Sequence, residues 1–130
     1  LRHFGATVTA VCATPHVELV RSLGADRVVD YTREDFTQTD DRYDLAFDAV
    51  GKSSFGACRP LLTPKGVYIS TEFGKRGENV YLALLTPLRG GKRVLFPLPS
   101  ISRDDVLFLK HLAETGQFRP LTDRRYPLDR

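Results

Sequence analysis

Short apolar runs alternate with segments of helical periodicity along this chain of 130 residues. The runs are rich in Val, Ile, Leu, Phe and Tyr and do not alternate strictly with polar residues, as expected of strands that are covered on both faces. Five strands are expected, at residues 7–12, 27–31, 43–49, 66–71 and 93–96. Because helical segments separate them, the pattern predicts an α/β fold with a doubly wound parallel sheet and flanking helices.

Helix signals lie between the expected strands. Thr14 followed by Pro15 predicts a helix start with Thr14 as the cap, and Gly24 suits the left-handed residue that ends this helix. Thr32 and Asp35 have the spacing of a capping box, which predicts a short helical turn. Three apolar residues of the first helix are expected to face the sheet: Val17, Val20 and Leu23.

Further helices are expected in the second half of the chain. Helices are expected at residues 53–62 and 78–88, and a turn at residues 63–66 ends the first of them. Ser102, with Asp105 three residues on, caps a last helix that ends at Gly116. Its apolar stripe consists of Val106, Leu109, Leu112 and Ala113. No internal repeat is evident, so residues 1–130 are expected to form one domain.

Composition narrows the class of protein. Hydrophobic residues make up 42% and charged residues 27% of the chain, which is typical of a soluble globular protein and disfavours disorder. The net charge of +3 is spread out, so neither a nucleic-acid surface nor a membrane surface is expected. No apolar run of about 18 residues occurs and Leu1 begins no targeting peptide, so a cytoplasmic location is expected.

The two cysteines do not predict a metal site. Cys12 and Cys58 are far apart and have no matching histidine pair, which disfavours a zinc cluster. They are expected to be buried, reduced thiols.

Candidate ligand-binding residues are those that follow the strands, because ligands bind beyond the carboxyl ends of parallel strands. We expect cofactor contacts from Cys12, Ala13, Thr14, His16, Tyr31, Val50, Gly51, Thr71, Glu72, Phe73 and Gly74. Gly51 lets backbone approach a ligand closely, and Phe73 is placed to lie against a nicotinamide. Asp48 either holds the loop after its strand or caps the next helix. Taken alone, the glycine-rich loop after residue 71 is more simply a turn.

The expected 2′-substituent of a dinucleotide follows from a missing acid. In a dinucleotide-binding domain, an Asp or Glu near the end of the second strand bonds the ribose 2′-hydroxyl and repels a 2′-phosphate. The strand at residues 7–12 corresponds to that second strand. This chain has residues 12–14, Cys-Ala-Thr, at that place, so NADP is favoured over NAD. Thr14, backbone N–H groups, His16 and Arg33 would meet the phosphate. In the equally weighted alternative, Thr14 is only a helix cap and His16 an exposed first-turn residue.

Five segments in order resemble the cofactor domain of medium-chain dehydrogenases/reductases, with the closest likeness to the quinone oxidoreductase-like and zinc-binding alcohol dehydrogenase-like branch. They are GATVTAVC at 5–12, LGAD at 23–26, DYTREDF at 30–36, FDAVG at 47–51 and LTPKG at 62–66. Residues 124–128, RRYPL, also resemble the stretch in which that family's chain turns back to its catalytic domain. The resemblance implies a partial Rossmann-type sheet and a dinucleotide-binding domain at residues 1–130.

The resemblance also implies where the cofactor contacts lie. Residues 12–14 and His16 would surround the adenosine ribose and its 2′-phosphate, although His16 replaces the lysine or arginine common in NADP-using relatives. Tyr31 would pack near the adenosine, Val50 near the middle of the cofactor, and residues 71–74 near the nicotinamide. In the zinc-free branch, hydride passes directly from NADPH to a quinone or enone.

The family's first strand, glycine-rich turn and GroES-like catalytic domain have no counterpart in the chain. In zinc-dependent relatives that catalytic domain supplies the metal ligands, so no catalytic residue and no zinc is expected here. The first strand would lie between the strands that end at Cys12 and Ala49, so we expect a gap there, or a homodimer in which another copy fills it. The chain is therefore expected to be a fragment or a truncated gene product.

Two hypotheses on function remain. In the first, the chain is the cofactor-binding portion of an NADP-dependent oxidoreductase, inactive alone, whose complete protein passes hydride between NADPH and a small-molecule quinone, enone or alcohol/carbonyl substrate. In the second, it is a noncatalytic, degenerate nucleotide-binding or assembly module. A methyltransferase is disfavoured, because its glycine-rich opening and the acid after its second strand are both lacking.

Overall fold

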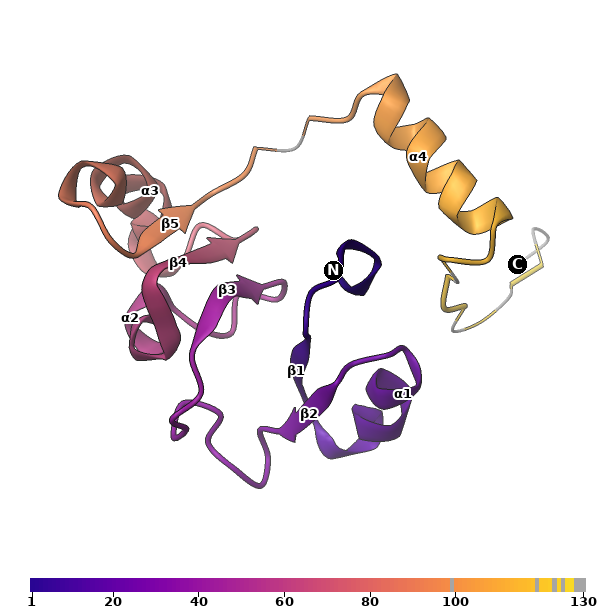
Figure 1. Cartoon of the computed structure of the whole chain (residues 1–130), viewed down its shortest axis with the longest axis horizontal. Coiled ribbons are helices and arrows are strands. Elements are labelled where there is room, and N and C mark those ends of the chain that lie inside the picture. The colour runs from indigo at the N-terminus through magenta and orange to yellow at the C-terminus, as the bar shows by residue number, and fades with distance from the viewer. Residues whose placement is uncertain (99, 119, 123, 125, 128–130) are drawn as a thin grey trace. The chain divides into compact units, whose positions relative to one another are not determined.

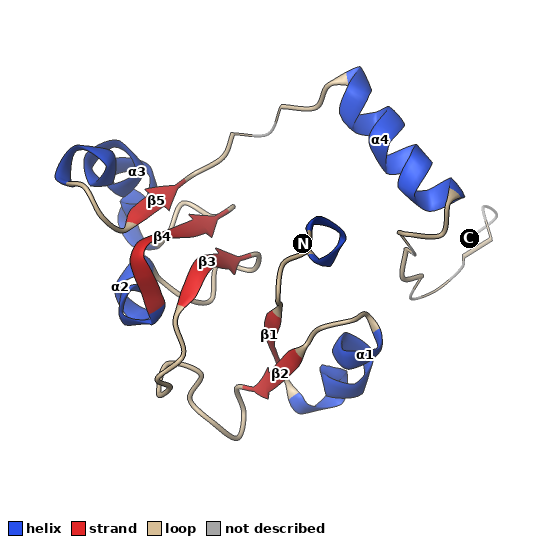
Figure 2. Cartoon of the chain, viewed as in Figure 1, coloured by secondary structure: helices blue, strands red, loops and turns tan. Residues whose placement is uncertain are grey.

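The computed structural model describes residues 1–98, 100–118, 120–122, 124, 126 and 127. They form two compact units, Leu1–Leu98 and Pro99–Arg130, of which the first contains the strands and the second the helix α4 (Figures 1 and 2). All three strand pairs in the described residues are parallel, and a helix lies in the connection of each pair. The predicted α/β fold with parallel strands and flanking helices is confirmed.

The first unit begins with the 3₁₀ turn η1 (Arg2–Phe4), and a two-stranded parallel sheet follows it. Strand β1 (Thr9–Cys12) pairs with β2 (Arg27–Asp30), and the register ends with Cys12 opposite Asp30. The 3₁₀ turn η2 (Thr14–His16) and helix α1 (Val17–Ser22) connect the two strands.

Helix α1 starts later than expected, because Thr14 does not cap it. No side-chain cap bond forms at the start of η2 or of α1, and the Thr14 hydroxyl donates to Asp30 instead. Gly24 ends the segment with a φ of 97°, as predicted. The expectation that Leu23 faces the sheet is wrong: the residue is 58% exposed, because the helix ends at Ser22.

The segment between β2 and the next strand contains no helix, although one turn closes where the N–H groups of Arg33 and Glu34 donate to the Asp30 carbonyl at 3.0 Å. Thr32 does not act as a cap, since its N–H and hydroxyl both donate to Asp30, at 2.9 and 2.6 Å. Asp35 accepts the same pair of bonds from Thr37, at 2.9 and 2.7 Å. Each carboxylate thus closes a local turn with the residue two positions on, which prevents the predicted capping box.

A second parallel sheet has the strand order β3-β4-β5. Its strands are β3 (Tyr43–Asp48), β4 (Leu62–Ser70) and β5 (Arg93–Leu95). The connections are α2 (Phe55–Cys58) with η3 (Arg59–Leu61), and η4 (Lys75–Gly77) with α3 (Glu78–Arg89). A core of Cys58, Leu62, Tyr68 and Val94 lies under these helices and packs against Phe36, Ala46, Phe55, Leu82 and Ala83.

Strand β4 begins earlier than expected. Leu62 pairs with Tyr43, after which the register shifts and Leu45 pairs with Val67. Residues 63–66, predicted as a turn before the strand, therefore form an irregularity inside it.

The two sheets are separate. Within the described residues, β1 pairs only with β2 and β3 only with β4, so each has one edge without a strand partner. This agrees with the gap expected between the strands that end at Cys12 and Ala49.

The second unit contains α4 (Arg103–Glu114). Ser102 and Asp105 form the predicted capping box, with bonds of 3.1 and 2.9 Å, and Gly116 follows the helix with a φ of 70°. Leu112 is buried, whereas Val106 and Leu109 are about half exposed. Arg125 and Leu128 of the segment 124–128 lie outside the described residues. No helix in the described part of the chain has the length and apolarity to cross a bilayer.

Candidate functional site

The ends of the strands place the predicted residues in two groups, one at each sheet. Beside the ends of β1 and β2 lie Cys12, Ala13, Thr14, His16 and Tyr31. In the loops after β3 and β4 lie Val50, Gly51, Thr71, Glu72, Phe73 and Gly74. Both groups therefore stand at carboxyl ends of parallel strands, where ligands bind in such folds.

Asp30 organises the first group. The Thr14 hydroxyl donates to its Oδ2 at 2.5 Å, and the Thr32 hydroxyl donates to its Oδ1 at 2.6 Å. The two hydroxyl oxygens lie 2.9 Å apart, and Arg33 Nε lies 3.7 Å from Asp30 Oδ2. His16 and Tyr31 are both exposed to solvent, and in the sequence they lie within two residues of Thr14 and Asp30, respectively.

These contacts keep Asp30 ionised. Hydrogen bonds from the Thr14 and Thr32 hydroxyls, then from the Thr32 N–H and the charge of Arg33, outweigh partial desolvation and hold the pKa of Asp30 below its usual value. An anion therefore stands beside the end of β1 at neutral pH.

Sequence reasoning missed Asp30, because it looked for an acid only in the residues that follow the first expected strand. The signal was present: parallel pairing of residues 9–12 with 27–30 brings the last residue of each strand together. The acid thus comes from the neighbouring strand.

Asp48 holds the loop that carries Val50 and Gly51. Its carboxylate accepts four backbone N–H groups of residues 50–53, at 2.8 to 3.3 Å, and the Tyr68 hydroxyl at 3.0 Å. Ser54 caps α2, so the first of the two roles considered for Asp48 is the correct one.

The charge states around Asp48 follow from these bonds. Burial raises the pKa of Asp48, but the bonds from the Ser53 N–H, the Tyr68 hydroxyl and the N–H groups of Val50 and Gly51 outweigh it and lower the pKa overall. Burial, followed by the bond to Asp48, raises the pKa of Tyr68, which stays a neutral donor. The loop is therefore held by a buried tyrosine hydroxyl and an ionised carboxylate.

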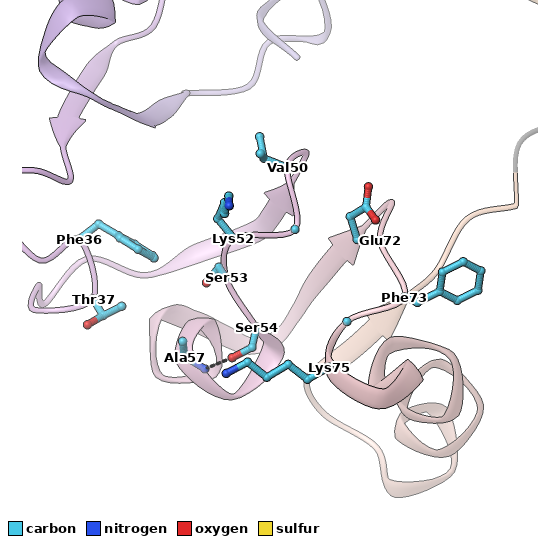
Figure 3. A pocket seen from close by; sticks show the side chains of 12 residues that line it. Phe36, Thr37, Val50, Lys52, Ser53, Ser54, Ala57, Glu72, Phe73 and Lys75 are labelled. Carbon is cyan, nitrogen blue, oxygen red and sulfur yellow. Dashed lines mark hydrogen bonds between the residues drawn. The ribbon is translucent and has the colours of Figure 1, made fainter.

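A pocket of about 550 Å³ opens at the carboxyl ends of β3 and β4 (Figure 3). Predicted residues in its lining are Val50, Gly51, Glu72, Phe73 and Gly74. Its volume is in the range of small-molecule sites. A smaller pocket of about 250 Å³, at Gly56, Arg59, Pro60 and Lys92, lies near the opposite ends of the strands.

Other residues of the larger pocket were missed. They include Phe36 and Thr37 from the segment between β2 and β3, Ser53 and Ser54 before α2, and two cations, Lys52 and Lys75. Sequence reasoning considered only the first few residues after each strand, whereas loops from three segments converge here.

Two glycines allow the loops after β3 and β4 to approach closely. Gly51 has a φ of 70°, and a Cβ there would lie 2.5 Å from Glu72 Cγ. Gly74 has a φ of 73°, and a Cβ there would lie 2.9 Å from Asn79 Nδ2. Asn79 Nδ2 in turn donates to the Glu72 carbonyl at 2.8 Å. The loop is therefore a packed wall of the pocket, which only glycine at these positions allows.

Phe73 is 64% exposed, and its ring lies 5.3 Å from that of Phe96, pointing away from the other labelled side chains in Figure 3. Both cysteines are free; Cys58 is buried as predicted, and Cys12 is only half-buried. Across the described residues, no three His, Cys, Asp or Glu side chains are grouped to hold a metal ion.

Comparisons with known proteins identify relatives of this chain. The profile of a family described as zinc-binding dehydrogenase matches residues 23–130. The chain is 34% identical over 126 residues to the chloroplastic NADPH-dependent alkenal/one oxidoreductase of Arabidopsis thaliana, covering 95% of this chain and 28% of that protein. It is 28% identical over 130 residues to the chloroplast envelope quinone oxidoreductase homolog of the same plant, covering 96% and 39%.

A solved structure supports the fold. The quinone oxidoreductase of Coxiella burnetii superposes with a TM-score of 0.75 at 20% identity, over 91% of this chain and 36% of that one. The chain therefore spans between about a quarter and two fifths of the length of these proteins.

Proposed function

This chain belongs to the zinc-binding dehydrogenase family, and we propose that it is the cofactor-binding portion of an NADPH-dependent oxidoreductase. Family membership confirms the resemblance to medium-chain dehydrogenases/reductases carried by the five sequence segments. The proposed reaction transfers a hydride between NADPH and a quinone, enone or alcohol/carbonyl substrate. In support, the two plant relatives are named as an NADPH-dependent alkenal/one oxidoreductase and a quinone oxidoreductase homolog.

The observation that carries the proposal is the pocket at the ends of β3 and β4. Five residues proposed from sequence as cofactor contacts line it, and Gly51 and Gly74 let the loops after β3 and β4 pack closely as its wall. A cavity at the carboxyl edge of a parallel sheet is suited to a nucleotide. The residues present therefore fit a dinucleotide.

Within this proposal, the chain's residues bind and orient the cofactor. Residues 12–14 and His16 would surround the adenosine ribose and its 2′-phosphate, and Tyr31 would pack near the adenosine. Val50 would lie near the middle of the cofactor, and residues 71–74 near the nicotinamide side. NADPH supplies the hydride when bound. Positioning is the main contribution of the chain, because no side chain in it is assigned to move a proton.

The proposed activity belongs to the complete protein. The relatives are longer than this chain, and their additional length would provide the substrate's binding surface. We propose that residues 1–130 are inactive alone.

Calorimetric titration of the complete protein with NADPH and NADH tests the cofactor assignment. His16→Ala removes one polar contact to the 2′-phosphate, and Thr14→Ala removes a hydroxyl that donates to the Asp30 carboxylate and offsets part of its charge beside that phosphate. Each variant is therefore expected to weaken NADPH binding about fivefold. NADH lacks this phosphate, so its affinity in the same variants is the internal control and should not change. Unchanged NADPH affinity in both variants would remove the 2′-phosphate assignment.

Loss of NADPH absorbance with a quinone and with an enone tests the reaction. We expect turnover by the complete protein and none by residues 1–130. Cofactor binding without turnover of any of the proposed substrate classes would favour the noncatalytic nucleotide-binding module.

A further inference from the structure

Asp30 lies at the position where the proposed function places the 2′-substituent of the cofactor. The β1–β2 register ends with Cys12 opposite Asp30, and Thr14 reaches back to the Asp30 carboxylate. Only 12% of the Asp30 side chain is exposed, so its position is fixed by its partners. Asp30, the last residue of β2, thus supplies the carboxylate that residues 12–14 lack.

The hydroxyl protons of the cluster are already committed. Each threonine hydroxyl has one proton; Thr14 donates it to Asp30 Oδ2 and Thr32 to Asp30 Oδ1. A phosphate dianion can only accept hydrogen bonds, so neither hydroxyl can serve it while it serves Asp30. A ribose 2′-hydroxyl, by contrast, has a proton of its own and can donate it to either threonine hydroxyl oxygen. Its binding therefore does not require Thr14 or Thr32 to give up a bond to Asp30.

The negative charge of Asp30 also disfavours a 2′-phosphate at this position. Asp30 is an anion beside the proposed phosphate position, and like charges repel. Arg33 lies 3.7 Å from Asp30 Oδ2 while 76% of its side chain is exposed, so it partly balances the carboxylate and is free to turn toward solvent. NADPH would therefore bind here against Asp30 and with the help of Arg33.

We propose that Asp30 is a specificity-determining residue, whose carboxylate limits the preference of this site for NADPH over NADH. The inference rests on the proposed function. Asp30 both holds the Thr14 and Thr32 protons and repels the 2′-phosphate, so a neutral side chain of the same shape widens the preference.

The test is calorimetric titration of the complete protein and its Asp30→Asn variant with NADPH and NADH. The amide removes the charge and can donate to one threonine, which frees that hydroxyl proton for the phosphate. We expect the dissociation constant for NADPH to fall about tenfold and that for NADH to change less than about twofold. Added salt should reduce the NADPH shift, because it screens the charge.

Asp35→Asn is the matched control. Asp35 makes the same two bonds, to the N–H and hydroxyl of Thr37, and removing it changes the net charge equally. Within the described residues, the bonds of Asp35 to Thr37 stay inside its own loop, whereas Asp30 also bonds Thr14 in η2, sixteen residues away. The NADPH-to-NADH ratio of Asp35→Asn should equal that of the unaltered protein.

The affinity ratio is measured within each variant, so an unfolded fraction lowers the apparent stoichiometry for both cofactors and leaves the ratio intact. If Asp30→Asn does not fold, Asp30→Ser removes the same charge. An unchanged ratio in the Asp30 variant, or an equal shift in Asp35→Asn, would overturn the inference while cofactor binding upholds the proposed function. Binding of neither cofactor by the unaltered protein would refute both.

Discussion

Replacing Gly66 with alanine is expected to lower the free energy of unfolding by about 3 kcal/mol, the cost of inserting an atom into a closely packed interior. Gly66 is buried at the irregularity of β4, where the register against β3 shifts. A Cβ at this residue would lie 2.8 Å from Leu62 Cβ and 3.0 Å from the Tyr43 carbonyl oxygen. One of these contacts is backbone, so no side-chain rotation can relieve it. Urea denaturation of the protein measures the loss.

Gly56→Ala is the matched control. Gly56 lies in α2, and the nearest atom to a Cβ there is Ser54 Oγ at 3.8 Å, an ordinary contact. Alanine has the higher helix propensity, so this variant should be as stable as the unaltered protein or more stable by about 0.5–1 kcal/mol. If Gly66→Ala costs less than about 1 kcal/mol, the register shift of β4 is not as tightly packed as the distances indicate.

The sequence predicted the order and type of most elements because those depend on local signals. Apolar runs marked the strands, and stops such as Gly24 and Gly116 marked helix ends, both with positive φ in the structure. The errors arose where a distant partner competes with a local one. Thr14 is of a residue type that often caps helices, yet its hydroxyl donates to Asp30, sixteen residues away. Leu62 extends β4 only because it pairs with Tyr43.

The candidate site divides in the same way. The rule that ligands bind after parallel strands identified residues such as Val50 and Phe73, since strand ends can be located from the apolar pattern. Phe36 and Lys75 also line the pocket, yet their loops have no periodicity that fixes where they lie. Asp30 could have been found by pairing the expected strands in parallel. Side chains positioned by strand register are therefore within reach of sequence reasoning, whereas those positioned by loop convergence are not.

Replacing Asp48 with alanine is expected to lower the free energy of unfolding by about 3 kcal/mol. The carboxylate accepts four N–H groups of residues 50–53 and the hydroxyl of Tyr68, whose side chain is fully buried. The loop N–H groups can turn to water, but the Tyr68 hydroxyl would lose its acceptor inside the core. Tyr68→Phe removes that donor alone and should cost about 1 kcal/mol. Denaturation of both variants and the double variant measures the coupling between the two side chains.

The pH dependence of the Asp48 contribution has a definite sign. Its pKa in the folded protein is lowered from the ordinary value of 3.8, so the bonds favour the ionised form and stabilise the fold fully above that ordinary value. The contribution is lost as pH falls through the lower, folded pKa. The stability difference between the unaltered protein and Asp48→Ala should thus be constant near neutral pH and shrink in acid below 3.8. A difference that grows on acidification would mean that the protonated carboxyl, and not the anion, holds the loop that presents Val50 and Gly51 to the pocket.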